Sequence, residues 1–406
     1  MIESLTATPV FVLAGGAGER LSPLTESKPK PAVSFGATHQ IIDFTISNCI
    51  NSGLRRIFVL TQYQREHLQK YIRETRVRLS SHFRWNEGDE LLSLPPLSGK
   101  RYRGTADAVF QNLPLVSFDP PEHVVIASGD HVYSMDYRAL LAHHASSGAD
   151  LTMGVVRRPV SEAAQFGVVD VADGMVERFT EKPSREGLPS TGDVVVSMGV
   201  YVFRWRALSE LAEHALPMEI DFGRDFVPQL ARRHRVAVYD FDQVRRSYWR
   251  DVGSLDTYYQ ANMDLLGPVR KFDPEEDPNW PVYAVGESET RRCDDSRISL
   301  GAFVDRSSVI DRSIVSHGAC IGKGAVIENS IVLPDSRVGD NVHLRNAIVA
   351  EGAAIADNVK VGLNPHLDRT RFSITPGGVV IVAPTLRTTS ERLVQERVER
   401  RTVSAA

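Results

Sequence analysis

Cysteine is scarce in this chain of 406 residues: Cys49, Cys293 and Cys320 are three, an odd number, and lie far apart. That spacing predicts neither a disulfide framework nor a zinc site. Long hydrophobic runs are also lacking. The longest run near the start, residues 10–14, is far shorter than the ~20 residues of a membrane-spanning helix, and it lacks the charged region and cleavage site of a signal peptide. We therefore expect a soluble, cytoplasmic protein that does not bind a membrane.

An excess of one charge is lacking too. Lysine and arginine number 47 against 51 acidic residues, so the net charge is −4. This balance excludes a globally basic nucleic-acid binder, and we expect no nucleic-acid partner. Apolar residues make up 42% of the chain and charged residues 24%, as in ordinary globular proteins. At roughly 150 residues per domain, the length predicts two or three domains.

The first two-thirds of the chain alternates strand-like and helix-like segments, and we predict one α/β domain over residues 1–266. Apolar runs without alternation indicate strands buried on both faces, as in a parallel sheet covered by helices. Three such runs occupy residues 9–14, 56–61 and 123–127. Helices are expected at 41–52, 64–76 and 206–216, and a strand at 193–203.

The next part of the chain is repetitive. Three series of aliphatic residues each recur every 17 positions: Ile298, Val315, Val332 and Val349; Val304, Ile321, Val338 and Ile355; Ile310, Ile327, Leu344 and Val361. Steps of six, six and five residues within each unit predict three short strands per coil of a parallel β-helix over residues 294–372. Turn-forming residues recur at one phase, where a corner needs them: Gly301, Gly318, Asp335 and Gly352. Irregular β-hairpins are the alternative.

Two segments have weaker patterns. Residues 267–293 carry four prolines among acidic residues, which predicts an ordered linker with turns. Residues 373–406 are expected to form a C-terminal strand and a polar tail. After Pro384, a short amphipathic helix and disorder both remain open.

The first apolar run leads into a glycine-rich loop, residues 15–18, followed by Arg20. Glycines after a strand bring backbone N–H groups close to an anion. The loop is not a Walker A loop, and Leu21 stands where a dinucleotide fingerprint needs its third glycine. Arg20 and the later Lys30 add cations, which suits a polyphosphate. A plain tight turn is the alternative.

Two aspartates are candidate metal ligands. Asp130 follows the third apolar run, at the sheet edge where open α/β folds bind ligands, and Asp251 lies near Gly253. Two such carboxylates can share one Mg²⁺ whose coordination is completed by substrate phosphates. The residues alone favour a helix cap for Asp130, and a salt bridge remains open for Asp251. The histidines, including His131, show no ligand spacing and are interpreted as structural or surface residues.

In this order, the segments resemble the bacterial ADP-glucose pyrophosphorylases, or glucose-1-phosphate adenylyltransferases. The glycine loop indicates only some sugar nucleotidyltransferase, whereas residues 47–53 and the Gly-Thr-Ala-Asp-Ala run at 104–108 are more specific. The resemblance implies a Rossmann-like nucleotidyltransferase domain followed by a left-handed parallel β-helix, in a homotetramer. It also implies a Mg²⁺-dependent reaction of ATP with α-glucose 1-phosphate to give ADP-glucose and pyrophosphate, the committed step of glycogen synthesis.

The resemblance also implies residue roles. The catalytic residues would be Arg20, Lys30, Asp130 and Asp251, of which the two aspartates bind Mg²⁺. ATP would be bound by Leu13, Ala14, Gly15, Gly16, Gly18, Gln62, Gly104, Thr105 and Asp107. Glucose 1-phosphate would be bound by Tyr102, Gly167, Glu181, Lys182, Ser197, Asp221 and Trp249. In-line phosphoryl chemistry needs positioning and charge neutralisation more than a general base, so no catalytic histidine or cysteine is assigned.

Three other functions compete with this one. A pyrophosphorylase using UTP, dTTP or GTP is disfavoured by the run at 104–108. A non-catalytic regulatory subunit of the same family should have lost a charged site residue, yet all are present: Arg20, Lys30, Asp130, Lys182 and Asp251. An acyltransferase is suggested only by the six-residue steps of the β-helix.

One departure from the family pattern yields a prediction. Bacterial members carry basic residues near the N-terminus that bind a glycolytic phosphate activator, and here Ser27, Ser34 and Gln40 occupy those positions. We predict weak, absent or altered activation, because the site is depleted of the cations that would hold the effector's phosphates. Compensation by the neighbouring Lys28 is the alternative. Activity measured across fructose 1,6-bisphosphate, fructose 6-phosphate and pyruvate checks this. Strong stimulation by the bisphosphate would contradict it.

Overall fold

The computed structural model describes residues 5–81, 85–97, 100–218, 220–267, 270–284, 290–293 and 295–384. The chain forms two compact units, one of Met1–Leu265 with Val269–Ser288 and one of Leu266–Pro268 with Glu289–Ala406. Residues 270–284 of the expected linker belong to the first unit and form turns. The expected polar tail after Pro384 lies outside the described residues.

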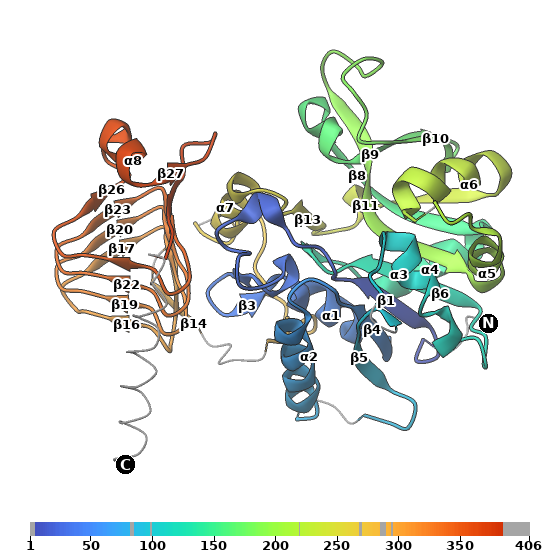
Figure 1. Cartoon of the computed structure of the whole chain (residues 1–406), viewed down its shortest axis with the longest axis horizontal. Coiled ribbons are helices and arrows are strands. Elements are labelled where there is room, and N and C mark those ends of the chain that lie inside the picture. The colour runs from blue at the N-terminus through green and yellow to red at the C-terminus, as the bar shows by residue number, and fades with distance from the viewer. Residues whose placement is uncertain are drawn as a thin grey trace. The chain divides into compact units, whose positions relative to one another are not determined.

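The first unit is built on a mixed sheet in the order β5-β4-β1-β6-β11-β8-β12-β10-β9 (Figure 1). Its strands are β1 Pro9–Leu13, β4 Arg56–Leu60, β5 Glu90–Leu94, β6 His123–Ser128, β8 Leu151–Pro159, β9 Gly167–Ala172, β10 Met175–Glu181, β11 Asp193–Arg204 and β12 Val236–Asp240. The three apolar runs become β1, β4 and β6, which pair in parallel as predicted. β11 runs antiparallel to both β6 and β8.

Helices and side chains cover both faces of this sheet. The helices are α1 Ile41–Asn51, α2 Arg65–Leu79, α3 Thr105–Phe110, α4 Tyr137–Ser147, α5 Trp205–His214, α6 Val227–Arg233 and α7 Leu255–Met263. Successive β1 residues enter different cores: Val10 and Val12 pack with α1, α2 and α4, whereas Phe11 packs with α3 and α6. This explains why the run is apolar without alternation. No helix in the described part of the chain has the length and apolarity needed to cross a membrane.

A separate two-stranded ribbon joins two distant parts of the first unit. β7 His131–Ser134 pairs antiparallel with β13 Tyr248–Asp251, and Asp251 lies opposite His131. The helix cap that the residues favoured for Asp130 is wrong, because β7 follows this residue at once. A smaller ribbon of β2 Ser34–Phe35 and β3 His39–Gln40 precedes α1.

The second unit is a parallel β-helix. Its strands are β14 Thr290–Cys293, β15 Ser296–Ser299, β16 Phe303–Val304, β17 Val309–Asp311, β18 Ile314–Val315, β19 Cys320–Ile321, β20 Val326–Glu328, β21 Ile331–Val332, β22 Arg337–Val338, β23 His343–Arg345, β24 Ala347–Val349, β25 Ala354–Ile355 and β26 Lys360–Val361. Neighbouring strands pair with the predicted offset of 17 residues. Ile298 pairs with Val315, Val304 with Ile321, and Ile310 with Ile327.

Burial and corner geometry follow the same repeat. The repeat residues of the inner coils are buried, whereas those of the first coil are half-buried. Three predicted corners, Gly318, Asp335 and Gly352, have left-handed φ values of 70°, 57° and 69°. Gly301 serves close packing instead, because a Cβ there would lie 2.0 Å from the His317 ring. The described chain ends with α8 Pro365–Arg371, β27 Ser373–Ile374 and β28 Val380–Val382, which pairs with β24.

The interface between α1 and α2 holds a fully buried carboxyl group. The backbone N–H of Gln40 donates to Oδ2 of Asp43 at 2.7 Å. The Tyr71 hydroxyl donates to the same carboxyl group at 2.7 and 2.8 Å. Burial outweighs these hydrogen bonds and raises the pKa of Asp43 from 3.8 to about 7.

The raised pKa of Asp43 predicts pH-dependent stability. Between pH 3.8 and about 7 the folded chain holds a proton that the unfolded chain has released. The contribution of Asp43 is therefore complete below that range and is lost as the pH rises through it. Asp43→Asn cannot titrate but still accepts from Tyr71. We expect the free energy of unfolding of the wild type, measured relative to this variant by urea titration, to fall across the range. Parallel curves would contradict the prediction.

Candidate active site

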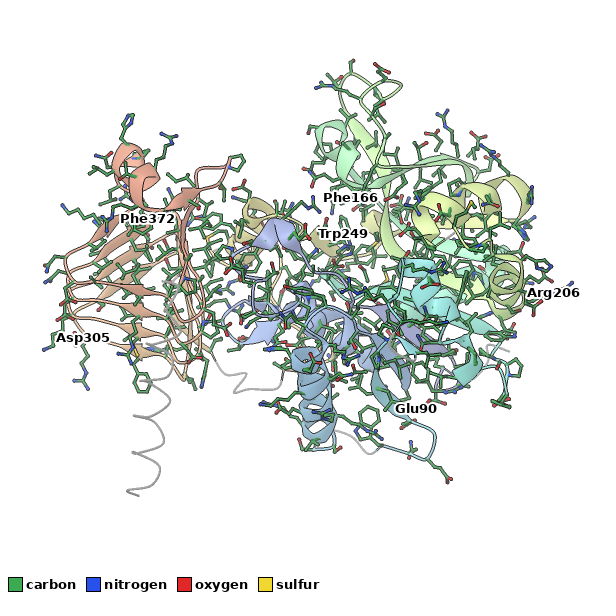
Figure 2. All side chains as sticks on the ribbon, viewed as in Figure 1. Glu90, Phe166, Arg206, Trp249, Asp305 and Phe372 are labelled. Atoms are coloured by element: carbon green, nitrogen blue, oxygen red, sulfur yellow. The ribbon has the colours of Figure 1, made fainter. Side chains whose placement is uncertain are left out.

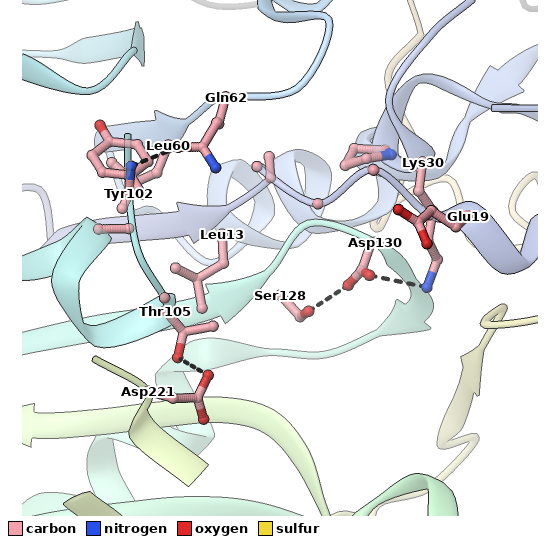
Figure 3. A pocket seen from close by; sticks show the side chains of 18 of the residues that line it. Leu13, Glu19, Lys30, Leu60, Gln62, Tyr102, Thr105, Ser128, Asp130 and Asp221 are labelled. Atoms are coloured by element: carbon pink, nitrogen blue, oxygen red, sulfur yellow. Dashed lines mark hydrogen bonds and ion pairs between the residues drawn. The ribbon is translucent and has the colours of Figure 1, made fainter. Parts of the chain in front are cut away.

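A cavity of about 670 Å³ opens at the carboxyl ends of β1, β4 and β6 in the first unit. Its lining includes these predicted site residues: Leu13, Ala14, Gly15, Gly16, Gly18, Arg20, Lys30, Gln62, Tyr102, Gly104, Thr105, Asp130 and Asp221 (Figure 3). The other predicted residues lie outside this lining: Asp107, Gly167, Glu181, Lys182, Ser197, Trp249 and Asp251. Most of the nucleotide-side prediction therefore shares one cavity, whereas most of the sugar-side prediction does not line it.

The glycine loop lies against the stem of Lys30. Gly18 has a left-handed φ of 69°, and a Cβ there would lie 2.7 Å from the Cβ of Lys30. Its carbonyl oxygen accepts a hydrogen bond from the Thr25 hydroxyl at 3.0 Å. Because both the φ value and the close approach favour glycine, the sequence can place the loop this near to a cation.

One ammonium group joins the two candidate metal ligands. Lys30 Nζ lies 2.9 Å from Asp130 Oδ2 and 3.0 Å from Asp251 Oδ1, and the lysine side chain is only 8% exposed. The Ser128 hydroxyl donates to Asp130 Oδ1 at 2.6 Å. His131 Nε2 lies 3.6 and 3.7 Å from carboxylate oxygens of Asp130 and Asp251. The β7–β13 pairing thus brings both aspartates to one point.

The charges in this cluster stabilise one another. Burial alone would lower the pKa of the Lys30 ammonium, but Asp130 and Asp251 together raise it above its ordinary value. Burial would also raise the pKa of Asp130, yet Lys30, followed by His131 and Ser128, holds it well below its ordinary value. All these groups are therefore arranged to keep the carboxylate charge and the ammonium charge together.

Arg20 lies beside the same cluster. A Cβ on Gly253 would lie 2.9 Å from Arg20 Nη2 and 2.8 Å from Asp251 Oδ2. The absence of a side chain at Gly253 therefore leaves room for both the guanidinium and the carboxylate. Arg20 and Lys30 give this end of the cavity two cations, which is the charge that a polyphosphate requires.

The donor set fits a divalent cation that is shared with a substrate. In the described residues, no three His, Cys, Asp or Glu side chains form a group that could hold a metal by themselves. Asp130 and Asp251 do converge on one cation, the Lys30 ammonium. Mg²⁺ prefers oxygen ligands and is commonly held by one or two carboxylates plus phosphate oxygens. The pair therefore suits Mg²⁺ that arrives with a phosphorylated ligand.

The other end of the cavity is formed by the segment from Tyr102 to α3. The backbone N–H of Tyr102 donates to Gln62 Oε1 at 2.5 Å. Thr105 Oγ1 donates to Asp221 Oδ2 at 2.9 Å (Figure 3). It also accepts from the backbone N–H of Phe222 at 3.0 Å. Thr105 therefore joins the nucleotide-side turn to the segment that carries Asp221. Asp107 does not line the cavity. Its carboxylate forms an ion pair with Arg103 at 2.6 Å and so stabilises the turn that contains both residues.

Two carboxylates lie close together on the predicted sugar side. A Cβ on Gly223 would lie 2.7 Å from Glu181 Oε2 and 3.5 Å from Asp221 Oδ1, and one on Gly167 would lie 3.0 Å from Glu181 Oε2. Burial raises the pKa of Glu181; Lys182 opposes this shift and Asp221 adds to it. Acidic oxygens on this side can accept hydrogen bonds from sugar hydroxyls.

Lys182 and Ser197 lie on the same side. Lys182 has a left-handed φ of 43°, and its Nζ lies 3.5 Å from Glu181 Oε1 with 63% of the side chain exposed. Its backbone N–H donates to the Phe166 carbonyl at 2.9 Å, which fixes the start of this turn. Ser197 is buried, and its hydroxyl lies 3.3 Å from the Tyr201 hydroxyl.

Trp249 is part of the packing behind the aspartates. It is buried, and its ring centroid lies 5.2 Å from that of His131. The Phe166 ring, whose centroid is 5.7 Å away, is labelled near it in Figure 2. The Arg158 guanidinium lies 4.9 Å from the ring centroid. These contacts hold the β7–β13 ribbon in place, so the geometry gives Trp249 a supporting position rather than one in the cavity lining.

Sequence reasoning missed three site residues. His131 was interpreted as structural or surface, but it lies beside both aspartates. Ser128 and Arg103 line the cavity, whereas His131 lies outside its lining. The sequence did contain a signal for two of them, because His131 directly follows Asp130 and Arg103 directly follows Tyr102. Nothing in the sequence shows that the Ser128 hydroxyl points towards Asp130.

The fold and this cavity define an enzyme of the nucleotide-binding α/β class with an appended β-helix. A family model described as nucleotidyl transferase matches residues 10–267, and one described as GlmU-like, C-terminal hexapeptide, matches residues 281–382. The second match identifies the β-helix as the left-handed hexapeptide type.

Curated relatives narrow the family further. The chain is 38% identical over 399 residues to glucose-1-phosphate adenylyltransferase 2 of Alkalilimnicola ehrlichii, with 93% of each chain covered. It is 43% identical to glucose-1-phosphate adenylyltransferase 2 of Vibrio parahaemolyticus, covering 67% of this chain and 69% of the relative. It is 44% identical to glucose-1-phosphate adenylyltransferase of Shewanella amazonensis, covering 70% of each. The chain belongs to the glucose-1-phosphate adenylyltransferase family of nucleotidyltransferases.

The Thr105 bridge predicts a difference between two substitutions. Thr105→Val loses both hydrogen bonds and leaves Asp221 and the Phe222 N–H without this partner. We expect it to lower the free energy of unfolding of the first unit by about 1–3 kcal/mol. Thr105→Ser keeps the hydroxyl and should lower it by less. Urea unfolding of both variants measures this, and equal stability of the two variants would contradict the bridge.

Proposed function

We propose that this chain catalyses the reaction of ATP with α-glucose 1-phosphate to form ADP-glucose and pyrophosphate. The observation that carries the proposal is the convergence of Asp130 and Asp251 on Lys30, with Arg20 beside them, at the end of the glycine loop. Polyphosphate chemistry needs this combination of carboxylates and cations. The identity to curated glucose-1-phosphate adenylyltransferases supports the choice of nucleotide and sugar.

The proposed mechanism rests on positioning and charge. An oxygen of the sugar phosphate attacks the α-phosphorus of ATP, the bond to the β-phosphate breaks, and pyrophosphate leaves on the opposite side. Arg20 and Lys30 stabilise the negative charge on the departing pyrophosphate. Asp130 and Asp251 would hold Mg²⁺, which supplies further neutralisation of phosphate charge. No proton has to be removed by a general base, because the attacking phosphate oxygen is already ionised.

The sugar side supplies orientation. Lys182 would pair with the phosphate of glucose 1-phosphate, since its ammonium is exposed and its backbone is fixed next to Phe166. Glu181 and Asp221, which both lie next to Gly223, would accept hydrogen bonds from the glucose hydroxyls. Gln62 and the turn at 104–107 would border the adenine. Held in this way, the sugar phosphate is oriented for in-line attack.

Two further proposals concern the whole molecule. We propose that the chain forms a homotetramer, as the resemblance implies, and its β-helix carries exposed apolar side chains that support an assembly: Leu300, Phe303 and Val309 are 53%, 71% and 54% exposed. We also propose that it works in the cytoplasm, because both substrates are phosphorylated metabolites.

Pyrophosphate release tests the proposed activity. Purified protein is given Mg²⁺, glucose 1-phosphate and one nucleotide at a time: ATP, UTP, dTTP or GTP. We expect turnover selective for ATP and a loss of at least about a hundredfold in Asp130→Asn, which removes one metal ligand. Turnover selective for another nucleotide would show that ATP is not the preferred substrate. No turnover in folded wild-type protein would favour the regulatory-subunit alternative.

A further inference from the structure

The ammonium of Lys30 and a divalent cation compete for the same two oxygens. These oxygens are Oδ2 of Asp130 and Oδ1 of Asp251, and both lie within hydrogen-bond distance of Lys30 Nζ. Mg²⁺ binds oxygen at about 2.0–2.1 Å, closer than an ammonium does. A metal ion between these two oxygens would stand next to Nζ, and two cations at such a distance repel strongly.

We propose that Lys30 is a placeholder cation: its ammonium occupies the metal position between Asp130 and Asp251 until a bound nucleotide offers it phosphate oxygens instead. This inference rests on the proposed function for the identity of the nucleotide. It goes beyond that function because it assigns Lys30 two alternative positions and makes metal and nucleotide binding interdependent.

The cluster needs a cation when no metal is bound. The side chains of Asp130 and Asp251 are 33% and 12% exposed, so water screens their mutual repulsion only in part. Arg20 Nη2 and Asp251 Oδ2 both lie next to Gly253, whereas Lys30 Nζ contacts Oδ1 of Asp251 and Oδ2 of Asp130. Lys30 Nζ lies 2.9 and 3.0 Å from the two carboxylates, closer than His131 Nε2 at 3.6 and 3.7 Å, and its ammonium keeps them converged.

The lysine can move only at its outer end. Its backbone begins a short 3₁₀ turn, Lys30–Ala32. Prolines precede and follow the lysine, at Pro29 and Pro31. Its Cβ and Cγ would lie 2.7 and 3.4 Å from a Cβ on Gly18, so the stem packs against the glycine loop. The last torsions can still swing the ammonium from the carboxylates towards that loop. A polyphosphate bound by the loop would be the new partner, and the swing would open the metal position.

Reciprocal coupling follows from this exchange. A metal ion alone must displace the ammonium from two carboxylates without offering it a new partner, so it binds weakly. A nucleotide that takes over the ammonium removes that cost, and by linkage the metal strengthens nucleotide binding by the same factor. Metal and nucleotide are therefore expected to enter together.

The binding of Mn²⁺ alone tests the placeholder. Free Mn²⁺ is measured by electron paramagnetic resonance with the full chain and no nucleotide. Lys30→Met removes the charge and keeps an unbranched side chain, and Lys30→Arg is the matched control that keeps a cation. We expect Lys30→Met to bind Mn²⁺ at least about tenfold more tightly than the wild type, a difference of about 1.4 kcal/mol. Lys30→Arg should bind it weakly, like the wild type.

A second substitution locates the metal. Adding Asp251→Asn to Lys30→Met should abolish the gain. Equal or weaker Mn²⁺ binding in Lys30→Met, or a gain that persists after Asp251→Asn, would overturn the proposal. Should Lys30→Met fail to fold, Lys30→Gln is compared in the same way, because it also removes the charge but keeps polar atoms for the carboxylates. The measurement contains no nucleotide, so its result is independent of whether turnover with ATP is found.

Discussion

The site depends on one backbone pairing. The antiparallel ribbon of β7 and β13 places Asp251 opposite His131, and therefore next to Asp130, although the two aspartates are far apart in the chain. Trp249 fixes the ribbon from behind by packing on His131 and Phe166. Two partly buried carboxylates that both contact one group would repel each other, and the ammonium of Lys30 between them offsets that repulsion. The strand register, the packing of Trp249 and the charge of Lys30 therefore all hold the two aspartates together.

Glycines at crowded positions make the rest of the site possible. At Gly104 a Cβ would lie 2.3 Å from the Ile220 carbonyl oxygen, and at Gly253 it would lie 2.9 Å from Arg20 Nη2 and 2.8 Å from Asp251 Oδ2. Neither residue needs a left-handed backbone, so sequence rules based on turns give no reason for them. The reason lies in tertiary contacts: the turn before α3 must touch the segment before Asp221, and a guanidinium must approach a carboxylate.

The sequence was most informative where a period or a continuous run reports burial. The 17-residue repeat predicted the strand pairing of the β-helix, because each coil repeats the same inward residue. The apolar runs predicted β1, β4 and β6, because residues on both faces of the sheet are buried. Contacts between distant segments carry no such local signal. The helix cap for Asp130 was wrong, and His131 was missed, because both depend on where β13 pairs. The individual site roles remain predictions. The glycine loop with its cations and the two aspartates were candidates from the residues themselves, whereas the sugar-side roles came from the resemblance.

The distribution of charge across the site gives the proposed reaction its direction. Arg20 and Lys30 are at the end where the glycine loop lies, whereas Glu181 and Asp221 lie close together next to Gly223. The nucleotide phosphates are attracted to the first end, and sugar hydroxyls can donate to the carboxylates of the second. Lys182, the proposed partner of the sugar phosphate, lies next to Glu181. Thr105 joins the two sides through Asp221 and the Phe222 N–H, so the distance between them is set by hydrogen bonds and not by the ligands. A sugar phosphate bound in this field presents its phosphate towards the nucleotide, which is the orientation that an in-line attack requires.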